Sequence, residues 1–419
     1  MREDIKERIE LIRAGKVPVG YKKTKLGIIP EEWEIVQIKD ILIKVDNLVE
    51  VKADEEYTQI GIRSHGKGIF YKEPVTGKEL GNKRVFWVEP DCFIVNIVFA
   101  WERAMARTTK DERGMIASHR FPMYRAINEK VFVDYLVQYF LTQKGKNVME
   151  AASPGGAGRN KTLGQERFMK SKIICPTMEQ QLKMVQILKV ADKTIFLNEK
   201  ELGEKKKIKK WLMQNLFARK MRLPGYQHKW TKGRLSTFLE EMTEKNKSAH
   251  VFNVKSISNK LGFINQSIQF TKKVASNDLS NYKIVKKGYI AYNPSRINVG
   301  SIALYHDEIL SVISPMYVVI KTKNGLDQKY FMYYVKTTIF NHYMKSQLSG
   351  SVRETLKFDD LSAIKIDLPS YDEQKAIVKV LETADKEIEL LEKKLELLKQ
   401  EKKAMMQLLL TGIVRVSEK

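Results

Sequence analysis

The sequence is poor in cysteine and has no long apolar run. It contains two cysteines, Cys92 and Cys175, in 419 residues, and they form no spaced motif. That usage is typical of a reducing compartment and argues against disulfides and against a cysteine-ligated zinc site. No segment reaches the roughly eighteen unbroken apolar residues of a membrane span. The first residues, Met-Arg-Glu-Asp-Ile-Lys, also lack the apolar core of a signal peptide. We therefore expect a cytoplasmic protein.

Signatures of catalysis are also missing. The glycine-rich segment 155–162 resembles a phosphate-binding loop, but Asn160 stands where that motif needs a glycine directly before the lysine. Residues 293–296, Asn-Pro-Ser-Arg, lack the second proline and the aromatic residue of the tetrad found in base-methylating enzymes. Pro90-Asp91 has no following acidic-x-lysine pair of a nuclease, and the six histidines are scattered. We expect no catalytic site, no metal and no cofactor.

Positive charge dominates what is present. Lys and Arg number 74 against 50 Asp and Glu, which gives a net charge of +24 and a pI near 9.6. Such an excess fits a polyanionic partner, with nucleic acid first and an acidic membrane surface second. The alternative is a soluble protein that is merely basic. The length allows two or three domains with cores of their own.

The chain repeats itself at a fixed offset. Thr162-Leu163 returns as Thr355-Leu356, an offset of 193 residues. The same offset relates Lys172-Ile173 to Lys365-Ile366, Pro176 to Pro369, Ala191-Asp192-Lys193 to Ala384-Asp385-Lys386, and Met213-Gln214 to Met406-Gln407. The match extends upstream to Pro122-Met123-Tyr124, which returns as Pro315-Met316-Tyr317. A tandem duplication of this size predicts two similar units with two similar binding sites.

The second copy ends in a long predicted helix. Ser370 and Glu373 predict a capping box at its start, and Gly412 suits its end. Apolar residues between them step by threes and fours, the seam of a coiled coil. They are Ile377, Leu381, Ala384, Ile388, Leu391, Leu395, Leu398, Met405 and Leu409, with Lys402 intervening.

The first copy has the same plan with interruptions. Thr177 and Gln180 predict the capping box, and Asn198, Lys205 and Lys209 interrupt the seam. We expect the two helices to pair with each other in antiparallel orientation, since the repeat relates them pseudo-symmetrically. Packing of each helix on its own domain is the alternative.

A strand-rich block precedes each helix. Residues 92–99 and 316–320 are β-branched and aromatic runs that predict strands. Residues 134–141 and 328–335 predict short amphipathic helices. Each block therefore looks like a compact α+β domain, and the fold class is α+β with two tandem, strand-rich domains and two long helices.

Three local motifs carry a family resemblance. Residues 21–33, Tyr-Lys-Lys-Thr-Lys-Leu-Gly-Ile-Ile-Pro-Glu-Glu-Trp, are similar to a family lead-in; residues 314–317 are similar to its mid-domain strand; and Pro369 with Asp372-Glu373-Gln374 is similar to the start of its conserved helix. With the tandem basic domains, they make the chain resemble the DNA-specificity subunit of a type I restriction-modification system. The first copy departs from the pattern, with Arg120-Phe121 where the second has Ile313-Ser314.

The resemblance implies a non-catalytic subunit with a pseudo-two-fold, circular plan. In that family each α+β domain recognises one half of a bipartite, asymmetric target in double-stranded DNA. The paired helices set the spacer and dock two methyltransferase subunits that methylate adenine with S-adenosylmethionine, and motor-nuclease subunits join to cut DNA. The implied parts are an N-terminal helix and lead-in (1–27), target-recognition domain 1 (28–176), a central helix (177–223), target-recognition domain 2 (224–369) and a C-terminal helix (370–419). A stand-alone DNA-binding coiled-coil scaffold or regulator, or a nuclease with an unrecognised site, is the alternative.

Candidate DNA contacts are polar and basic side chains in loops between strands. Lys and Arg neutralise phosphates, whereas Arg on guanine and Asn or Gln on adenine are the usual base pairings. In the first domain they are Arg63, Ser64, His65, Lys67, Arg103, Arg107, His119, Arg120, Arg159, Asn160 and Lys161; in the second they are Ser256, Ser258, Asn259, Lys260, Asn293, Ser295, Arg296 and Arg353. A solvated surface charge is the alternative for each. We expect the lysines at 205–207 and 209–210 to form a solvated helix face or to contact spacer phosphates.

Overall fold

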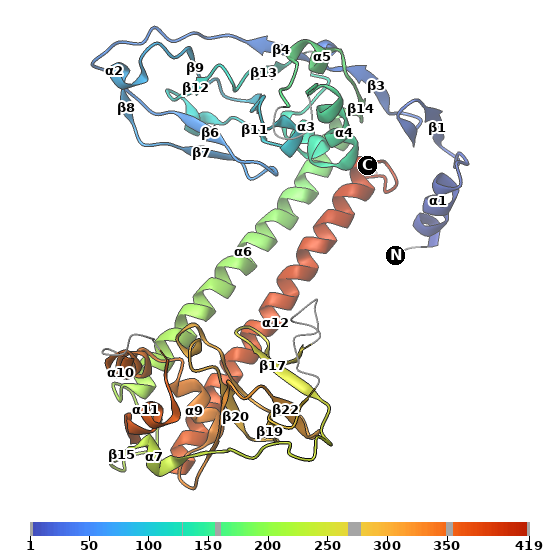
Figure 1. Cartoon of the computed structure of the whole chain (residues 1–419). Helices are drawn as coiled ribbons and strands as arrows, with labels where there is room; N and C mark the ends of the chain where they lie inside the picture. The colour runs from blue at the N-terminus through green and yellow to red at the C-terminus, as the bar shows by residue number, and fades with distance from the viewer. Residues whose placement is uncertain (1–2, 128, 156–160, 267–277, 349–354, 417–419) are drawn as a thin grey trace. The chain divides into compact units, whose positions relative to one another are not determined.

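The computed structural model describes residues 3–127, 129–155, 161–266, 278–348 and 355–416. The chain forms two compact units (Figure 1). Unit 1 comprises residues 1–198 and 394–419, and unit 2 comprises residues 199–393. Two helices of 40 residues, α6 (Met178–Phe217) and α12 (Tyr371–Leu410), each belong in part to both units.

Unit 1 begins with helix α1 (Glu3–Arg13) and the hairpin of β1 (Tyr21–Thr24) and β2 (Gly27–Pro30). Its central sheet has the order β11-β10-β13-β4, with bounds Met105–Arg107, Cys92–Val95, Met123–Ala126 and Leu42–Val45. The other two-stranded sheets pair β5 (Glu56–Tyr57) with β8 (Val75–Thr76), β6 (Ile60–Ile62) with β7 (Ile69–Tyr71), β9 (Val85–Trp87) with β12 (Ile116–Ser118), and β3 (Glu34–Gln37) with β14 (Lys172–Cys175). Its short helices are α2 (Gly77–Leu80), α3 (Val133–Leu141), α4 (Gln143–Ala151) and α5 (Gln165–Lys170), with 3-10 turns η1 (Ile38–Asp40), η2 (Ala100–Glu102) and η3 (Lys110–Glu112).

Unit 2 follows the same plan. One sheet has the order β16-β23-β20-β21 and another the order β18-β17-β22-β19. Their bounds are Leu239–Glu241, Val318–Thr322, Ile290–Tyr292 and Ile302–Leu304 for the first, and Gly262–Asn265, Val254–Ser258, Ser311–Ile313 and Lys283–Val285 for the second. The other elements are the pair β15 (Thr231–Arg234) and β24 (Lys365–Leu368), helices α7 (Leu235–Phe238), α9 (Gln328–Tyr334), α10 (Thr338–Leu348) and α11 (Phe358–Ala363), and the turn η4 (Ile297–Val299). The tandem α+β architecture predicted from the sequence is therefore confirmed.

Buried aromatic side chains form the centre of each core. In unit 1, Phe168 of α5 packs against Phe93 of β10 and Phe140 of α3, with ring centroids 6.1 and 5.7 Å apart. In unit 2, Phe217 at the end of α6 packs on Tyr330 of α9, with ring centroids 4.7 Å apart. Because aromatic side chains bury large apolar areas, these contacts fasten α5 to the sheet and to α3 in unit 1, and α6 to α9 in unit 2.

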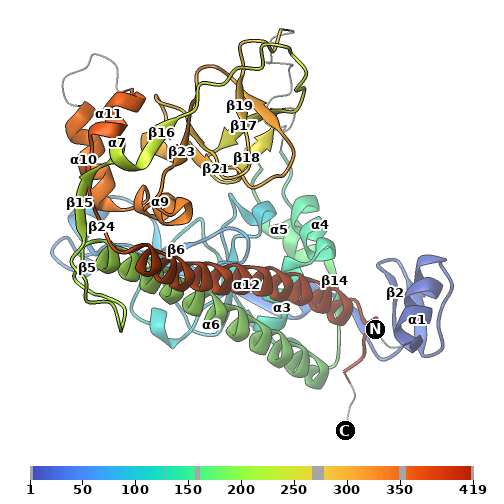
Figure 2. The same cartoon turned by 90° about the horizontal axis from the view of Figure 1, so that it is seen from below.

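The two long helices pair with each other in antiparallel orientation (Figures 1 and 2). In unit 2, Lys209 of α6 forms an ion pair with Asp385 of α12; in unit 1, Lys402 of α12 forms an ion pair with Asp192 of α6. Each residue of the second pair lies 193 positions from its counterpart in the first. Both helices also pack on their own units, because Leu188 and Leu381 are fully buried in the two cores. The helices therefore show both predicted kinds of packing: they pair with each other, and each also packs on the unit to which that part of it belongs.

Each predicted capping box forms the bond in which the cap hydroxyl accepts from the backbone N–H three residues later. The Ser370 hydroxyl accepts from the N–H of Glu373 at 3.3 Å, and the Thr177 hydroxyl accepts from the N–H of Gln180 at 3.4 Å. The Glu373 carboxylate, however, binds Arg222, with an N–O distance of 2.6 Å. The bond predicted from the Glu373 carboxylate to the start of α12 was wrong, because the Arg222 guanidinium, from the connection that follows α6, competes for this carboxylate.

The upstream extension of the repeat was wrong. Met123 is in strand β13 and 1% exposed, whereas Met316 lies in the turn before β23 and is 60% exposed. The strand registers show why. Ala126 faces Leu42 in one sheet and Thr322 faces Leu239 in the other, so Met123 corresponds to Val319. Residues 316–317, predicted as strand, therefore belong to a turn.

The duplication nevertheless reaches farther upstream than the sequence indicates. Strand β3 and strand β15 are 197 residues apart, and the same offset relates η2 to η4 and β11 to β21. The offset falls to 193 only from Thr162 onward, because the second unit is a few residues shorter in between. Such small differences in length break a sequence register while they leave the sheet intact.

Candidate nucleic-acid interface

Hydrogen bonds join several of the predicted contact loops in unit 1. The N–H of Ile97 donates to the carbonyl of Arg120 at 3.0 Å, and the N–H of Leu163 donates to the carbonyl of Ile97 at 2.8 Å. The amine of Lys161 lies 5.6 Å from the ring centroid of Trp101. The loops that carry Arg120 and Lys161 are thus parts of one surface. Trp101 also belongs to this surface, although the sequence does not predict it as a contact.

The β6–β7 hairpin loop lies against the η2 turn of the same unit. The N–H of His65 donates to the carbonyl of Glu102 at 2.9 Å, and the Ser64 hydroxyl donates to the Glu102 carboxylate at 3.0 Å. His65 and Arg103 both have left-handed backbone conformations, with φ of 63° and 62°. Since such conformations are costly for residues other than glycine, the surrounding hydrogen bonds must hold them. His65, Lys67 and Arg63 remain exposed on this loop.

Two of the predicted arginine contacts in unit 1 have protein partners. Arg107 forms ion pairs with Asp91 and with Asp134, the latter at 3.0 Å, and so ties β11 to α3. The Arg103 guanidinium donates to the carbonyl of Leu141 at 3.0 Å. The structure therefore assigns both to internal packing. His119 and Arg120 are exposed, and Arg159 and Asn160 lie outside the described residues.

Two predicted contacts in unit 2 are buried. Ser256 is 4% exposed, and its hydroxyl lies 3.4 Å from the Tyr317 hydroxyl. Asn293 is 7% exposed, and its side-chain oxygen accepts from the N–H of Ser295 at 3.0 Å. Asn96 of unit 1, 197 residues earlier, accepts from the N–H of Val98 in the same way. Both predictions are corrected, because these side chains shape the structure beneath the surface.

The remaining contacts predicted in unit 2 lie on two loops. Asn259 and Lys260 are exposed at the β17–β18 turn, where the Ser258 hydroxyl accepts from the N–H of Lys260 at 3.3 Å. Ser295 and Arg296 are exposed before η4. The N–H of Leu356 donates to the carbonyl of Pro294 at 3.0 Å, which joins that loop to the segment after α10. Arg353 lies outside the described residues.

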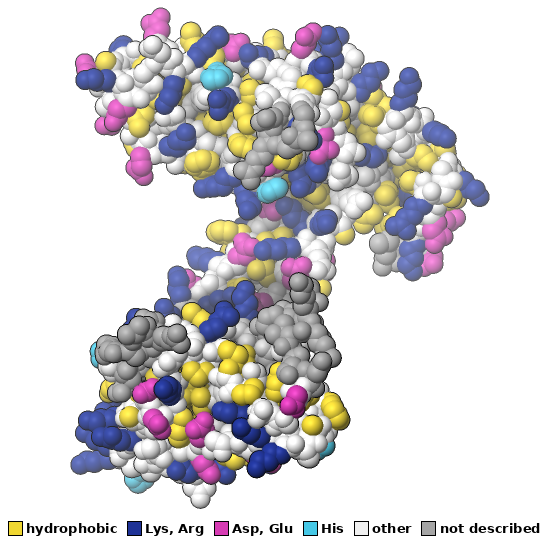
Figure 3. All heavy atoms as spheres, viewed as in Figure 1, with side chains coloured by type: hydrophobic (Ala, Val, Ile, Leu, Met, Phe, Trp, Pro, Cys, Tyr) yellow, Lys and Arg dark blue, Asp and Glu magenta, His cyan; other side chains and the backbone are white. Residues whose placement is uncertain are grey.

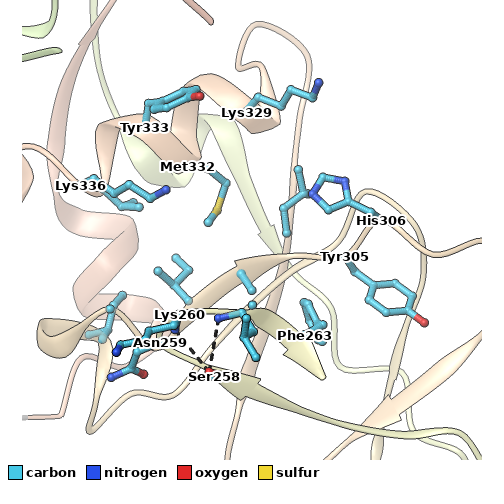
Figure 4. Close-up of a pocket in the computed structure, with 18 of the residues that line it drawn as sticks. Ser258, Asn259, Lys260, Phe263, Tyr305, His306, Lys329, Met332, Tyr333 and Lys336 are labelled. Carbon is cyan, nitrogen blue, oxygen red and sulfur yellow. Dashed lines mark hydrogen bonds between the residues drawn. The ribbon is translucent and has the colours of Figure 1, made fainter. Parts of the chain in front are cut away.

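A groove of about 690 Å³ lies inside unit 2 (Figure 4). The β17–β18 turn lines one side, and Lys329, Tyr333 and Lys336, from α9 and the residues after it, line the other. The sequence predicts Ser258, Asn259 and Lys260 as contacts, but not the lysines across the groove. No sequence signal identifies these, because the turn and α9 are about seventy residues apart and only folding brings them together.

Basic side chains are spread over the visible face of both units (Figure 3). Some of the α6 lysines that the sequence predicts as a solvated helix face or as contacts to spacer phosphates have other partners. Lys205 binds Glu387 at 2.5 Å and Lys206 binds Glu392 at 2.6 Å, both on α12, in addition to the pair of Lys209 and Asp385. These lysines join the two helices, so the structure does not favour the predicted contact of Lys205, Lys206 and Lys209 with spacer phosphates.

Neither a metal site nor a membrane helix is found in the part of the chain that the structure describes. No group of three His, Cys, Asp or Glu side chains there is placed to hold a metal ion. None of the helices in the described ranges has the length and apolar character that a bilayer crossing needs.

Two units of one plan, each with exposed basic loops, are the features expected of a DNA-specificity protein, and the sequence comparison supports that class. The model of the type I restriction modification DNA specificity domain matches residues 30–209 and 229–400. The chain belongs to that family. Membership agrees with the expectation of a specificity subunit that is not itself an enzyme.

Curated relatives match nearly the whole chain. The putative type I restriction enzyme MjaX specificity subunit of Methanocaldococcus jannaschii is 25% identical, with 95% of this chain and 97% of the relative covered. The type I restriction enzyme MjaVIII specificity subunit of the same organism is 23% identical, with 93% and 94% covered.

Solved structures show the same fold. The HsdS subunit from Thermoanaerobacter tengcongensis has a TM-score of 0.54 at 17% identity, with 92% of this chain and 98% of that chain covered. A chain from a study of complex assembly and conformational transition of the type I R-M system has a TM-score of 0.59 at 16% identity, with 92% and 99% covered.

Proposed function

We propose that this chain recognises a bipartite, asymmetric sequence in double-stranded DNA, one half with each unit. The observation that carries the proposal is a repeated frame with different loops. Gln181 and Gln374 are both fully buried, and each donates to the carbonyl of the proline before its long helix, Pro176 at 2.8 Å and Pro369 at 3.0 Å. The exposed loop residues do not repeat in this way. A common frame with different loops suits two different half-sites.

The proposed division of labour follows the five parts expected from the sequence: 1–27, 28–176, 177–223, 224–369 and 370–419. Within the two recognition domains, the proposed DNA contacts are the exposed residues on loops. They are Arg63, His65, Lys67, His119, Arg120 and Lys161 in unit 1, and Asn259, Lys260, Ser295 and Arg296 in unit 2. Phosphate contacts position the protein and base contacts specify the sequence, so this set is expected to contain both kinds.

Two methyltransferase subunits are the proposed partners of the long helices, and motor-nuclease subunits complete the assembly. Exposed large apolar side chains recur along both helices, and clustered exposed apolar surface marks protein–protein interaction sites, which supports a docking role. Leu197 of α6 and Leu390 of α12 are repeat-equivalent and are 51% and 58% exposed. Equivalent apolar positions on the two helices suit two copies of one partner. A cytoplasmic location follows, because the DNA target is there.

Mapping of methylated adenines tests the proposal. The full chain, expressed with its methyltransferase partner in a host that lacks other adenine methylation, is expected to direct methylation to one split, asymmetric sequence. The matched control is the methyltransferase without this chain, which is expected to leave the DNA unmodified. A continuous palindromic target would overturn the two-half-site assignment.

A further inference from the structure

The β6–β7 hairpin of unit 1 packs directly on the helix that follows the sheet. The backbone of Gly66 approaches Leu141 so closely that an added side-chain carbon would lie 2.6 Å from it. The Arg103 guanidinium, hydrogen-bonded to the Leu141 carbonyl, fills space beside this contact. Protein atoms therefore occupy the region between hairpin and helix in unit 1.

Unit 2 leaves the same region open. Gly300 stands at the left-handed position that Arg103 has in unit 1, 197 residues earlier, and no atom lies within 4 Å of its missing side chain. Lys336 stands where unit 1 has Leu141, since Thr142 and Thr337 next to them make the same hydroxyl bond to the carbonyl three residues earlier. The groove of unit 2 therefore results from particular substitutions in a shared frame.

Positive charge in the groove exceeds what its acidic groups neutralise. Lys329 pairs with Glu382 at 2.7 Å, and Asp307 pairs with Lys255 at 3.1 Å. Lys260 and Lys336 form no ion pair within the described ranges of the chain. Partial burial, followed by the nearby charge of Lys209, lowers the pKa of Lys336. An added anion would relieve this cost.

Asp385 is the acidic side chain whose charge acts on Lys336, and it already has other partners. Asp385 forms an ion pair with Lys209 and accepts a hydrogen bond from the Tyr333 hydroxyl at 2.7 Å. The Lys336 amine lies 5.6 Å from the Tyr333 ring centroid and extends into the space between α9 and the β17–β18 turn (Figure 4). The groove thus presents ammonium groups from its two sides.

We propose that this groove binds the sugar-phosphate backbone of duplex DNA beside the half-site of unit 2, an inference that rests on the proposed function. Lysine is a compact point charge and suits phosphate oxygens, whereas base edges favour flat, bidentate side chains. Asn259, Asn298 and Asn341 also line the groove and supply neutral donors. Because unit 1 has no equivalent opening between Gly66 and Leu141, the two units hold the DNA backbone differently.

Salt-dependent binding of the full chain to a short duplex of mixed sequence tests the inference. The double variant Lys260→Gln/Lys336→Gln is compared with Lys247→Gln/Lys379→Gln, which removes the same charge from exposed positions of unit 2 outside the groove. Between about 50 and 200 mM salt, the loss of two phosphate contacts is expected to reduce the slope of log affinity against log salt by about 2. The affinity for the duplex is expected to fall roughly tenfold in this range. The control variant is expected to keep the wild-type slope.

The outcomes separate the two proposals. If the wild-type chain shows no affinity for duplex DNA, the proposed function fails. If it binds DNA and the groove variant behaves like the control variant, only the groove inference fails. Lys260→Arg/Lys336→Arg retains the charge and is expected to restore the slope, which a mere folding defect at these positions would not predict. The methylated sequence is expected to stay the same in every variant, because phosphate contacts carry no sequence information.

Discussion

At the residue scale, burial separates side chains that shape the loops from those that remain available to DNA. Asn96 and Asn293 have the residue type of a base contact, but each closes a turn of its own unit through its side-chain oxygen. Arg107 likewise has two acidic partners, whereas Arg120 is exposed. We therefore expect DNA contacts from the exposed loop residues, and not from those whose side chains are buried or held by acidic partners of their own unit.

Arg107 and Arg120 provide a test of this distinction. Arg107→Gln is expected to lower the free energy of unfolding by about 1 kcal/mol, after allowance for solvent screening, and to leave the DNA affinity nearly unchanged. Arg120→Gln is expected to have the opposite profile, with stability within about 0.5 kcal/mol of wild type and weaker DNA binding. Thermal unfolding and duplex binding, measured on the same preparations, check both. Weaker binding by Arg107→Gln at unchanged stability would contradict the assignment.

At the element scale, the long helices combine local and tertiary stabilisation. The heptad seam explains the pairing, and two of the residues that interrupt it, Lys209 and Lys402, form repeat-related ion pairs across the helices. Partly exposed pairs of this kind contribute little energy, but they disfavour other registers. These two lysines thus help to specify how the two helices align.

Removal of one heptad from each helix tests the proposed role of the helices in setting the spacer. Deletion of residues 199–205 and the equivalent 392–398 retains both repeat-related ion pairs. Each helix loses about 10 Å of length, so the spacer is expected to shorten by about three base pairs while the half-sites stay the same. Adenine methylation mapping reads the result directly. An unchanged spacer in a folded, active variant would show that the helices do not set it.

At the scale of the whole molecule, the ends of the chain close the repeat. In unit 1 the Tyr21 hydroxyl donates to the carbonyl of Gly412 at 2.6 Å, and Arg415 binds Glu32 at 2.7 Å. In unit 2, Arg222 follows α6 as Arg415 follows α12, 193 residues apart, and it binds Glu373. In unit 1, contacts between residues near the two ends of the chain therefore fix the end of α12 to the unit. In unit 2, the continuous connection after α6 makes the comparable contact through Arg222.

A circular permutation is expected to retain function for this reason. Joining Lys419 to Met1 with a flexible linker and opening the chain between Gly225 and Tyr226 preserves the contacts of both Arg222 and Arg415. The permuted chain is expected to fold and to direct methylation to the same split sequence. A control opened between Tyr292 and Asn293, within the shared frame of unit 2, is expected to lose that half-site. If the first permuted chain directed methylation to a different sequence, the two terminal segments would not be equivalent to a continuous connection.

The sequence by itself determined the features that depend on neighbours along the chain. Steps of three and four and a serine cap placed the helix after Ser370, which spans Tyr371–Leu410, and the repeat placed its partner. Helix periodicity is local, so a single sequence contains it. The charge predicted the partner class in the same direct way.

Only the tertiary structure decided which residues meet. Met316 matched Met123 in sequence, yet strand pairing aligned Met123 with Val319, because register depends on residues far apart in the chain. Burial of Ser256 and Asn293 depends on the same long-range contacts. The groove required Gly300, Lys336 and the β17–β18 turn together, and no one of these is informative alone. Sites built from distant segments exist only once the chain has folded.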